Sequence, residues 1–100
     1  MIVKFENKKH ENCFNQKDEA VRLLGKEAAN YYIMAISLLD NSPALWGVTA
    51  FAFVKLSEIE GEVNLWQMTI KGLVLIMEII ESDSGVLINI KEVYDEKRKS

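Results

Sequence analysis

Apolar residues are most concentrated in three short runs in the second half of the chain, residues 63–70, 73–80 and 86–94. Turn residues separate these runs, with Lys71-Gly72 between the first and second and residues 82–85 between the second and third. Short apolar runs that are bounded by glycine-containing turns are typical of strands. The pattern therefore predicts three successive antiparallel strands.

The middle run is apolar at seven of its eight positions, and Glu78 is its one charged residue. A strand with one face in water alternates polar and apolar residues, so this run indicates a central strand that is covered on both faces. We expect helices to cover its odd-numbered residues. The opposite face then consists of Val74, Ile76, Glu78 and Ile80. A large apolar surface of this kind marks an interaction site, unless the chain's own termini cover it.

The first half of the chain predicts a pair of helices. Residues 7–16 are mostly polar and predict a loop. From Leu24 to Leu38, apolar residues recur at spacings of three and four, which places them on one helical stripe. Gly25 interrupts this pattern, and glycine is favoured just past a helix end. We therefore expect two helices, over residues 17–24 and 26–39.

Two more strands complete the expected fold, over residues 2–6 and 49–56, and the second of them places Phe51 and Phe53 on one face. Trp46 is expected to fill one end of the core. The resulting order is β-α-α-β-β-β-β. It predicts a single α+β domain over residues 1–100, in which a helical hairpin packs on a mostly antiparallel sheet.

The chain has 100 residues, of which 49% are hydrophobic and 27% are charged, and its net charge is −3. This composition is ordinary for a soluble globular protein. Cys13 and His10 are the only residues of their types, so we expect no disulfide, metal site or cofactor. No apolar run reaches the length of about 18 residues that spans a membrane, and a cytoplasmic protein is expected.

Charge is unevenly distributed, because residues 58–83 contain six acids and one base, Lys71. The turns near residues 58–61 and 82–85 each follow an odd number of chain reversals, which places them at the same end of the predicted sheet. Their acids would form one acidic rim, consisting of Glu58, Glu60, Glu62, Glu81 and Asp83. Such a rim is either a set of solvated turns, a contact for a basic protein or a site for a divalent cation.

Two parts of the chain carry a family resemblance. The front consists of residues 2–9, Cys13 and residues 23–29. The back consists of Lys55-Leu56, Gly61, Leu65-Trp66, Gly72, Leu75-Ile76 and residues 90–95. Together they resemble the RelE/HigB superfamily of toxins from toxin–antitoxin modules, in both the opening strand and helix pair and the strand–turn–strand core. The resemblance implies ribosome-dependent cleavage of messenger RNA, with the ribosome, mRNA and an antitoxin as partners.

The chain departs from this superfamily where the chemistry is carried out. RNA cleavage needs a base for the 2′-hydroxyl, an acid for the leaving oxygen and cations on the phosphate. Val74 stands at the position of the superfamily's arginine on the central strand, and Glu58 and Glu60 stand where a basic residue is expected. Of a closing Asp-Tyr-His pattern, only Asp95 matches. If activity is retained, the residues implied as catalytic are Asp95, Lys97 and Arg98.

Three functions are consistent with these observations. The first is a toxin-type RNase with relocated residues, and the second is a non-catalytic binding module on the same fold. The third is an unrelated small acidic immunity, antitoxin or anti-defence protein that inhibits a basic partner. We favour a catalytically impaired toxin-fold protein that binds an antitoxin, a toxin or another basic protein. The expected contact surface is the even-numbered face of residues 73–80 with the acidic rim, and a homodimer through this face is the alternative.

Overall fold

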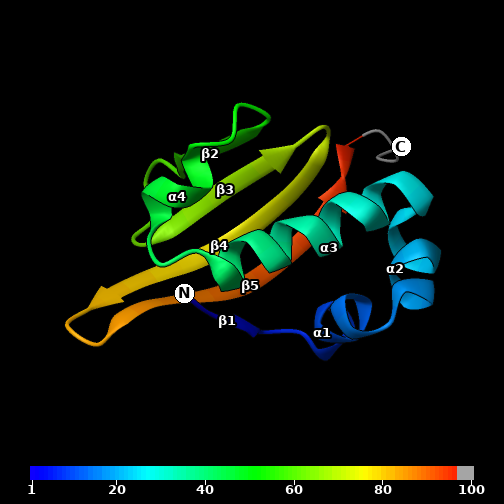
Figure 1. Cartoon of the computed structure of the whole chain (residues 1–100), viewed down its shortest axis with the longest axis horizontal. Coiled ribbons are helices and arrows are strands. Elements are labelled where there is room, and N and C mark those ends of the chain that lie inside the picture. The colour runs from blue at the N-terminus through cyan, green and yellow to red at the C-terminus, as the bar shows by residue number, and fades with distance from the viewer. Residues whose placement is uncertain (97–100) are drawn as a thin grey trace.

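The computed structural model describes residues 1–96, and it describes Trp46 by its backbone alone. The expected place of Trp46 in the core and the residues Lys97 and Arg98 therefore lie outside the described residues. Figure 1 shows the elements in chain order. They are β1 (Ile2–Phe5), α1 (Lys8–Asn15), α2 (Lys17–Leu24), α3 (Lys26–Asn41), α4 (Leu45–Thr49), β2 (Val54–Glu58), β3 (Leu65–Ile70), β4 (Leu73–Ser82) and β5 (Gly85–Asp95).

The strands form one five-stranded mixed sheet with the order β1-β5-β4-β3-β2. Strands β2 to β5 pair antiparallel with their neighbours, whereas β1 lies parallel to β5 at one edge. The two-residue turn Lys71-Gly72 joins β3 to β4, and both residues have positive φ angles, 49° and 92°. Such turns match the twist of paired strands. The predicted α+β class and the central position of β4 are confirmed.

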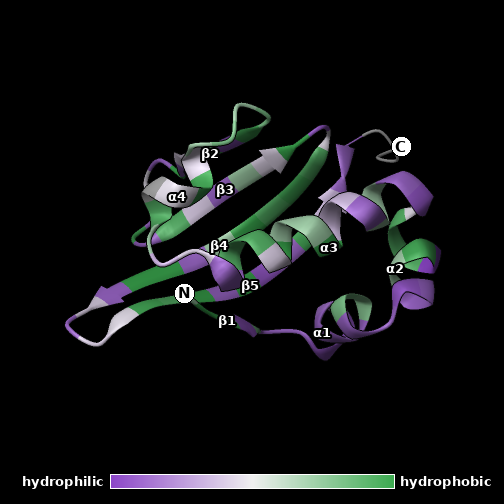
Figure 2. Cartoon of the chain, in the orientation of Figure 1, coloured by the Kyte–Doolittle hydropathy of each residue, from purple (hydrophilic) through white to green (hydrophobic). Residues whose placement is uncertain are grey.

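The described helices cover one face of this sheet (Figure 1). The odd-numbered residues of β4 from Leu73 to Ile79 are buried there, in one core cluster with α3 residues such as Ile36 and Leu39. Figure 2 shows the hydrophobic stretches of β3, β4 and β5 beside α3. This is the face that the sequence predicts to be covered by helices, and the expected helices over α2 and α3 are observed with a break at Gly25.

The expected loop over residues 7–16 is wrong, because most of this segment forms α1. Asn7 caps the helix by accepting a hydrogen bond of 2.9 Å from the backbone N–H of Lys9. Only His10 and Cys13 are buried in this helix, so the sequence shows too little apolar periodicity to reveal it. The buried hydroxyl of Tyr32 in α3 donates a hydrogen bond of 2.7 Å to the His10 carbonyl and ties α1 to the core.

The expected strand over residues 49–56 is also wrong in its first half. Helix α4 ends at Thr49, and β2 begins only at Val54, where pairing with Ile70 of β3 starts. Phe51 and Phe53 lie in the connection, are 43% and 40% exposed, and contact each other with ring centroids 5.7 Å apart. The Phe-Ala alternation is typical of a strand, but these residues have no partner strand in the described part of the chain. The expected order thus gains the two helices α1 and α4.

Stability is expected to depend on pH through His10. Burial, together with the charge of Lys9, lowers the pKa of His10, although Glu92 acts in the opposite direction. The unfolded chain takes up a proton near pH 6.5 and the folded protein only at lower pH, so the unfolded state binds more protons below that value. The free energy of unfolding should therefore fall as the pH decreases below about 6.5.

Urea unfolding between pH 7.5 and 5.5 measures this dependence, and a His10→Gln variant supplies the control. The variant is expected to show a flatter pH dependence than the wild type. Equal slopes for the two proteins would show that His10 titrates in the same way in the folded and unfolded states.

Candidate functional site

The sheet face opposite the helices carries an ion pair. At the bulge in β5, the Lys91 Nζ lies 3.0 Å from a Glu6 carboxylate oxygen. This hydrogen bond and the charge of Glu6, with a smaller contribution from Glu78, raise the pKa of Lys91. Lys91 is therefore engaged by carboxylates of its own chain. Glu78, the charged residue of the expected contact face, thus has a cation of its own chain nearby in Lys91.

The apolar residues of this open face differ in how much surface they present. Val74 is fully buried between its cross-strand neighbours Thr69 and Tyr94, so it offers no surface to a partner. Ile76 is half-buried. The exposed apolar residues of the face lie towards the other end of β4, in one cross-strand row. This row consists of Ile80, which is 39% exposed, the half-buried Leu87, and Ile2, which is 61% exposed.

The five residues of the acidic rim lie in or beside two connections, the β2–β3 loop and the β4–β5 turn. Figure 1 shows both connections at the same end of the sheet. All five residues are exposed. Within residues 1–96, none of their carboxylates forms an ion pair or a side-chain hydrogen bond. The rim therefore presents negative charge that this part of the chain does not neutralise.

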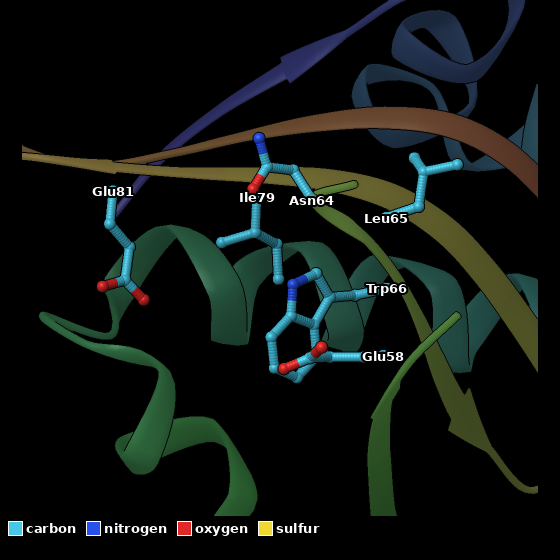
Figure 3. Close-up of a pocket in the computed structure, with 6 residues that line it drawn as sticks. All are labelled: Glu58, Asn64, Leu65, Trp66, Ile79 and Glu81. Carbon is cyan, nitrogen blue, oxygen red and sulfur yellow. The ribbon is translucent and has the colours of Figure 1, made fainter. Parts of the chain in front are cut away.

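A cavity of about 310 Å³ opens at this end of the sheet. It is lined by Glu58, Asn64, Leu65, Trp66, Ile79 and Glu81. Figure 3 shows the side chains of Glu58 and Trp66 close together, with Glu81 set apart beyond Ile79. Glu58 and Trp66 are directly paired residues of β2 and β3, which explains why their side chains project to the same side.

The cavity exists because β4 is longer than its neighbour. The backbone N–H of Ile79 donates a hydrogen bond of 2.9 Å to the carbonyl of Asn64, which precedes β3. Beyond this bond β4 continues to Ser82, whereas the chain before Asn64 turns away through the β2–β3 loop. The half-buried Trp66 pairs with Glu58 of β2 and Met77 of β4, and its side chain lines the open space at this end of the sheet.

An indole with one unpaired carboxylate beside it and a second at the other end of the cavity is suited to a cation. Lysine and arginine are attracted to the face of tryptophan, and carboxylates bind them through charge-assisted hydrogen bonds. Prediction from the sequence places Glu58 and Glu81 on one rim but does not connect Trp66 with them. The signal that could have linked them is the pairing of Glu58 with Trp66 across the β2–β3 hairpin.

Of the residues implied as catalytic, Asp95 lies within the described part of the chain, whereas Lys97 and Arg98 lie outside it. Asp95 pairs with Leu73, whose side chain is in the helix-covered core. It lines a small cavity of about 70 Å³ with Glu27, Tyr31 and Lys71, near the start of α3. Within residues 1–96, no three His, Cys, Asp or Glu side chains are placed to hold a metal ion.

Comparison of the chain with protein-family models, curated proteins and solved structures finds no match. The resemblance to the RelE/HigB superfamily therefore stays a prediction. Among the described residues, no helix has the length and apolar character needed to cross a membrane.

Proposed function

We propose that this protein binds a basic partner protein, as a component of a toxin–antitoxin-type system with a RelE/HigB-like fold and no RNA-cleaving activity of its own. The observation that carries this proposal is the acidic rim, whose five exposed carboxylates have no ion pair within residues 1–96. The contact surface is the rim with the adjoining apolar row of Ile2, Ile80 and Leu87.

The physical basis is the combination of charge and apolar surface at one end of the sheet. Unpaired carboxylates that share a rim raise the local concentration of a positively charged partner and accelerate its association. Removing apolar area from water stabilises the complex by about 25 cal/mol per Å². Ile80 and Ile2 supply such area at the same end of the sheet, on the face opposite to the side chains of Glu58 and Glu81, since they are 39% and 61% exposed. Binding should therefore weaken as the salt concentration rises.

RNA cleavage is the less favoured function because this surface offers a phosphate little positive charge. A phosphate needs free cations, but the Lys91 on this face pairs with Glu6. The buried Val74 occupies the position where the superfamily resemblance calls for an arginine. The carboxylates of the rim would repel a phosphate backbone. An acidic immunity or antitoxin protein that inhibits a basic toxin would use the same rim. The identity of the partner therefore distinguishes such an inhibitor from a toxin-fold protein without RNA-cleaving activity.

Neutralising the rim is expected to weaken the partner complex by about tenfold or more, because charge complementarity drives the association. The tagged protein is expressed in its native host, the partner that it retains is identified, and the complex is measured by calorimetry at two salt concentrations. The rim variant replaces Glu58, Glu60, Glu62 and Glu81 by Gln and Asp83 by Asn. A control with the same charge change removes five other negative charges, at Glu11, Asp18, Glu19, Asp40 and Glu96, of which Glu11 and Glu19 form ion pairs with Lys8 and Arg22.

The proposal requires a partner with net positive charge that the control variant still binds. It would be overturned by an acidic partner, by equal affinity of the rim variant and the wild type, or by messenger RNA cleavage when the protein is added to a ribosome-containing translation reaction.

A further inference from the structure

The rim cavity shows what part of such a partner would be recognised. We infer that an extended segment of the partner lies along the free edge of β4 and inserts an arginine side chain between Glu58 and Glu81, against Trp66. This inference rests on the proposed function and names the ligand of the same site.

The free edge of β4 follows from its pairing. The Ile79 N–H points to the β3 side, where it donates to the Asn64 carbonyl just beyond the β3–β4 ladder, so the next residue whose backbone groups point to that side is Glu81. Within residues 1–96, no strand pairs with β4 on that side after Glu78, and the only backbone bond beyond it is that of Ile79. An unpaired stretch of strand backbone is a template for an added peptide strand, which gains main-chain hydrogen bonds there.

The side chains beside this edge define what the added strand would carry. Side chains at Ile79 and Glu81 project to the cavity side, so an added strand would place every second side chain in or over the cavity. The volume of about 310 Å³ is at the small end of ligand pockets and suits one long side chain. The walls combine an indole with carboxylates at two ends, which selects a cation with a flat apolar surface.

Arginine meets this description better than lysine. Its planar guanidinium stacks on an aromatic face and presents several N–H groups in fixed directions, so it can reach carboxylates on two sides. A lysine ammonium is a compact charge that stays more strongly hydrated. An incoming arginine would not have to displace a cation of this chain, because Glu58 and Glu81 form no ion pair among the described residues.

The test uses a synthetic peptide, acetyl-Ser-Val-Arg-Val-Ser-amide, and the full chain with Trp46→Phe, which leaves Trp66 as the only tryptophan. Binding is followed by the fluorescence of Trp66. A second peptide carries citrulline, the neutral isostere of arginine. A third carries an N-methyl group on the backbone nitrogen of the arginine, whose N–H points to β4 in an antiparallel pairing that directs the arginine side chain into the cavity, so the methyl group blocks strand pairing. Both are expected to bind about tenfold more weakly than the arginine peptide.

Two double variants with the same charge change localise the binding. Glu58→Gln with Glu81→Gln removes the carboxylates of the cavity, whereas Glu60→Gln with Glu62→Gln removes two rim charges that do not line it. We expect about tenfold weaker binding for the first pair and a change of less than about twofold for the second. Urea midpoints establish that both variants are folded, which is expected because all four residues are exposed.

Three results would overturn the inference. Equal losses from the two double variants would mean that the rim attracts the peptide by total charge alone. Equal binding of the N-methylated and parent peptides would mean that the segment does not add to β4. Failure of the arginine peptide to bind the wild type would exclude the cavity as an arginine site. None of these results affects the capture of a basic partner, so the proposed function is judged separately by its own experiment.

Discussion

Replacing Leu75 by alanine is expected to lower the free energy of unfolding by about 2–5 kcal/mol. Leu75 is fully buried in the central strand β4, between Met68 of β3 and Val93 of β5, and it belongs to the core beneath the helices. The change removes buried methyl groups and leaves a cavity that the neighbouring strands can fill only in part. For a domain of this size, that loss is a large share of the total stability.

A matched control lies on the same strand. Ile80 faces the opposite side of the sheet and is 39% exposed, so Ile80→Ala should change the free energy of unfolding by no more than about 0.5 kcal/mol. Urea unfolding of both variants and the wild type measures the difference. A Leu75→Ala midpoint equal to that of the wild type would place Leu75 outside the core and contradict the observed layering of helices on the sheet.

Much of the sheet could be predicted because its signals are local. The turn at Lys71-Gly72 and the apolar run that follows it fix the β3–β4 hairpin. Strands β3 and β4 begin and end within two residues of the predicted bounds. The break at Gly25 likewise separates two helices, with a φ angle of 94° that glycine tolerates. These features depend on residues that are close in sequence.

Helix α1 could not be predicted because its stability comes from distant residues. Its sequence is polar, and the contacts that hold it are the burial of His10 and Cys13 and the hydrogen bond from Tyr32, 22 residues away from His10. Such tertiary contacts override weak local preference. The strand prediction at Phe51 and Phe53 was wrong for the opposite reason. The local pattern there is typical of a strand, but no partner strand pairs with it in the described part of the chain.

The sequence predicts the charged residues of the candidate site but not the shape of its cavity. Counting chain reversals suffices to place Glu58 and Glu81 at one end of the sheet. The cavity between them depends on how far β4 extends past the start of β3, and this difference in strand length is not apparent from the apolar pattern. The burial of Val74 on the otherwise open face was equally hidden, because it depends on its neighbours Thr69 and Tyr94 across the sheet.

The second large effect is expected at this buried position. Val74→Arg would restore the charge that the superfamily resemblance implies on the central strand, but it should destabilise the protein by about 3 kcal/mol or more. Val74 is 0% exposed, so the larger side chain must displace its neighbours and its guanidinium loses water without a partner in place. The measurement is urea unfolding, with circular dichroism to establish whether any folded protein remains.

Ile76→Arg on the same face of the same strand is the matched control. Ile76 is only half-buried, so a long arginine side chain there can lay its methylene groups along the sheet and keep its charge in water. We expect this variant to lose about 1 kcal/mol or less. The two variants add the same side chain and the same charge, and they differ only in the exposure of the site.

Equal, small losses for Val74→Arg and Ile76→Arg would mean that position 74 can open to solvent. An arginine could then reach the open face at the position where the superfamily resemblance implies one. A loss confined to Val74→Arg would mean that the packing of Val74 with Thr69 and Tyr94 has closed the position. Binding through the exposed end of the sheet, at Ile80 and the acidic rim, is then the function that this face can still support.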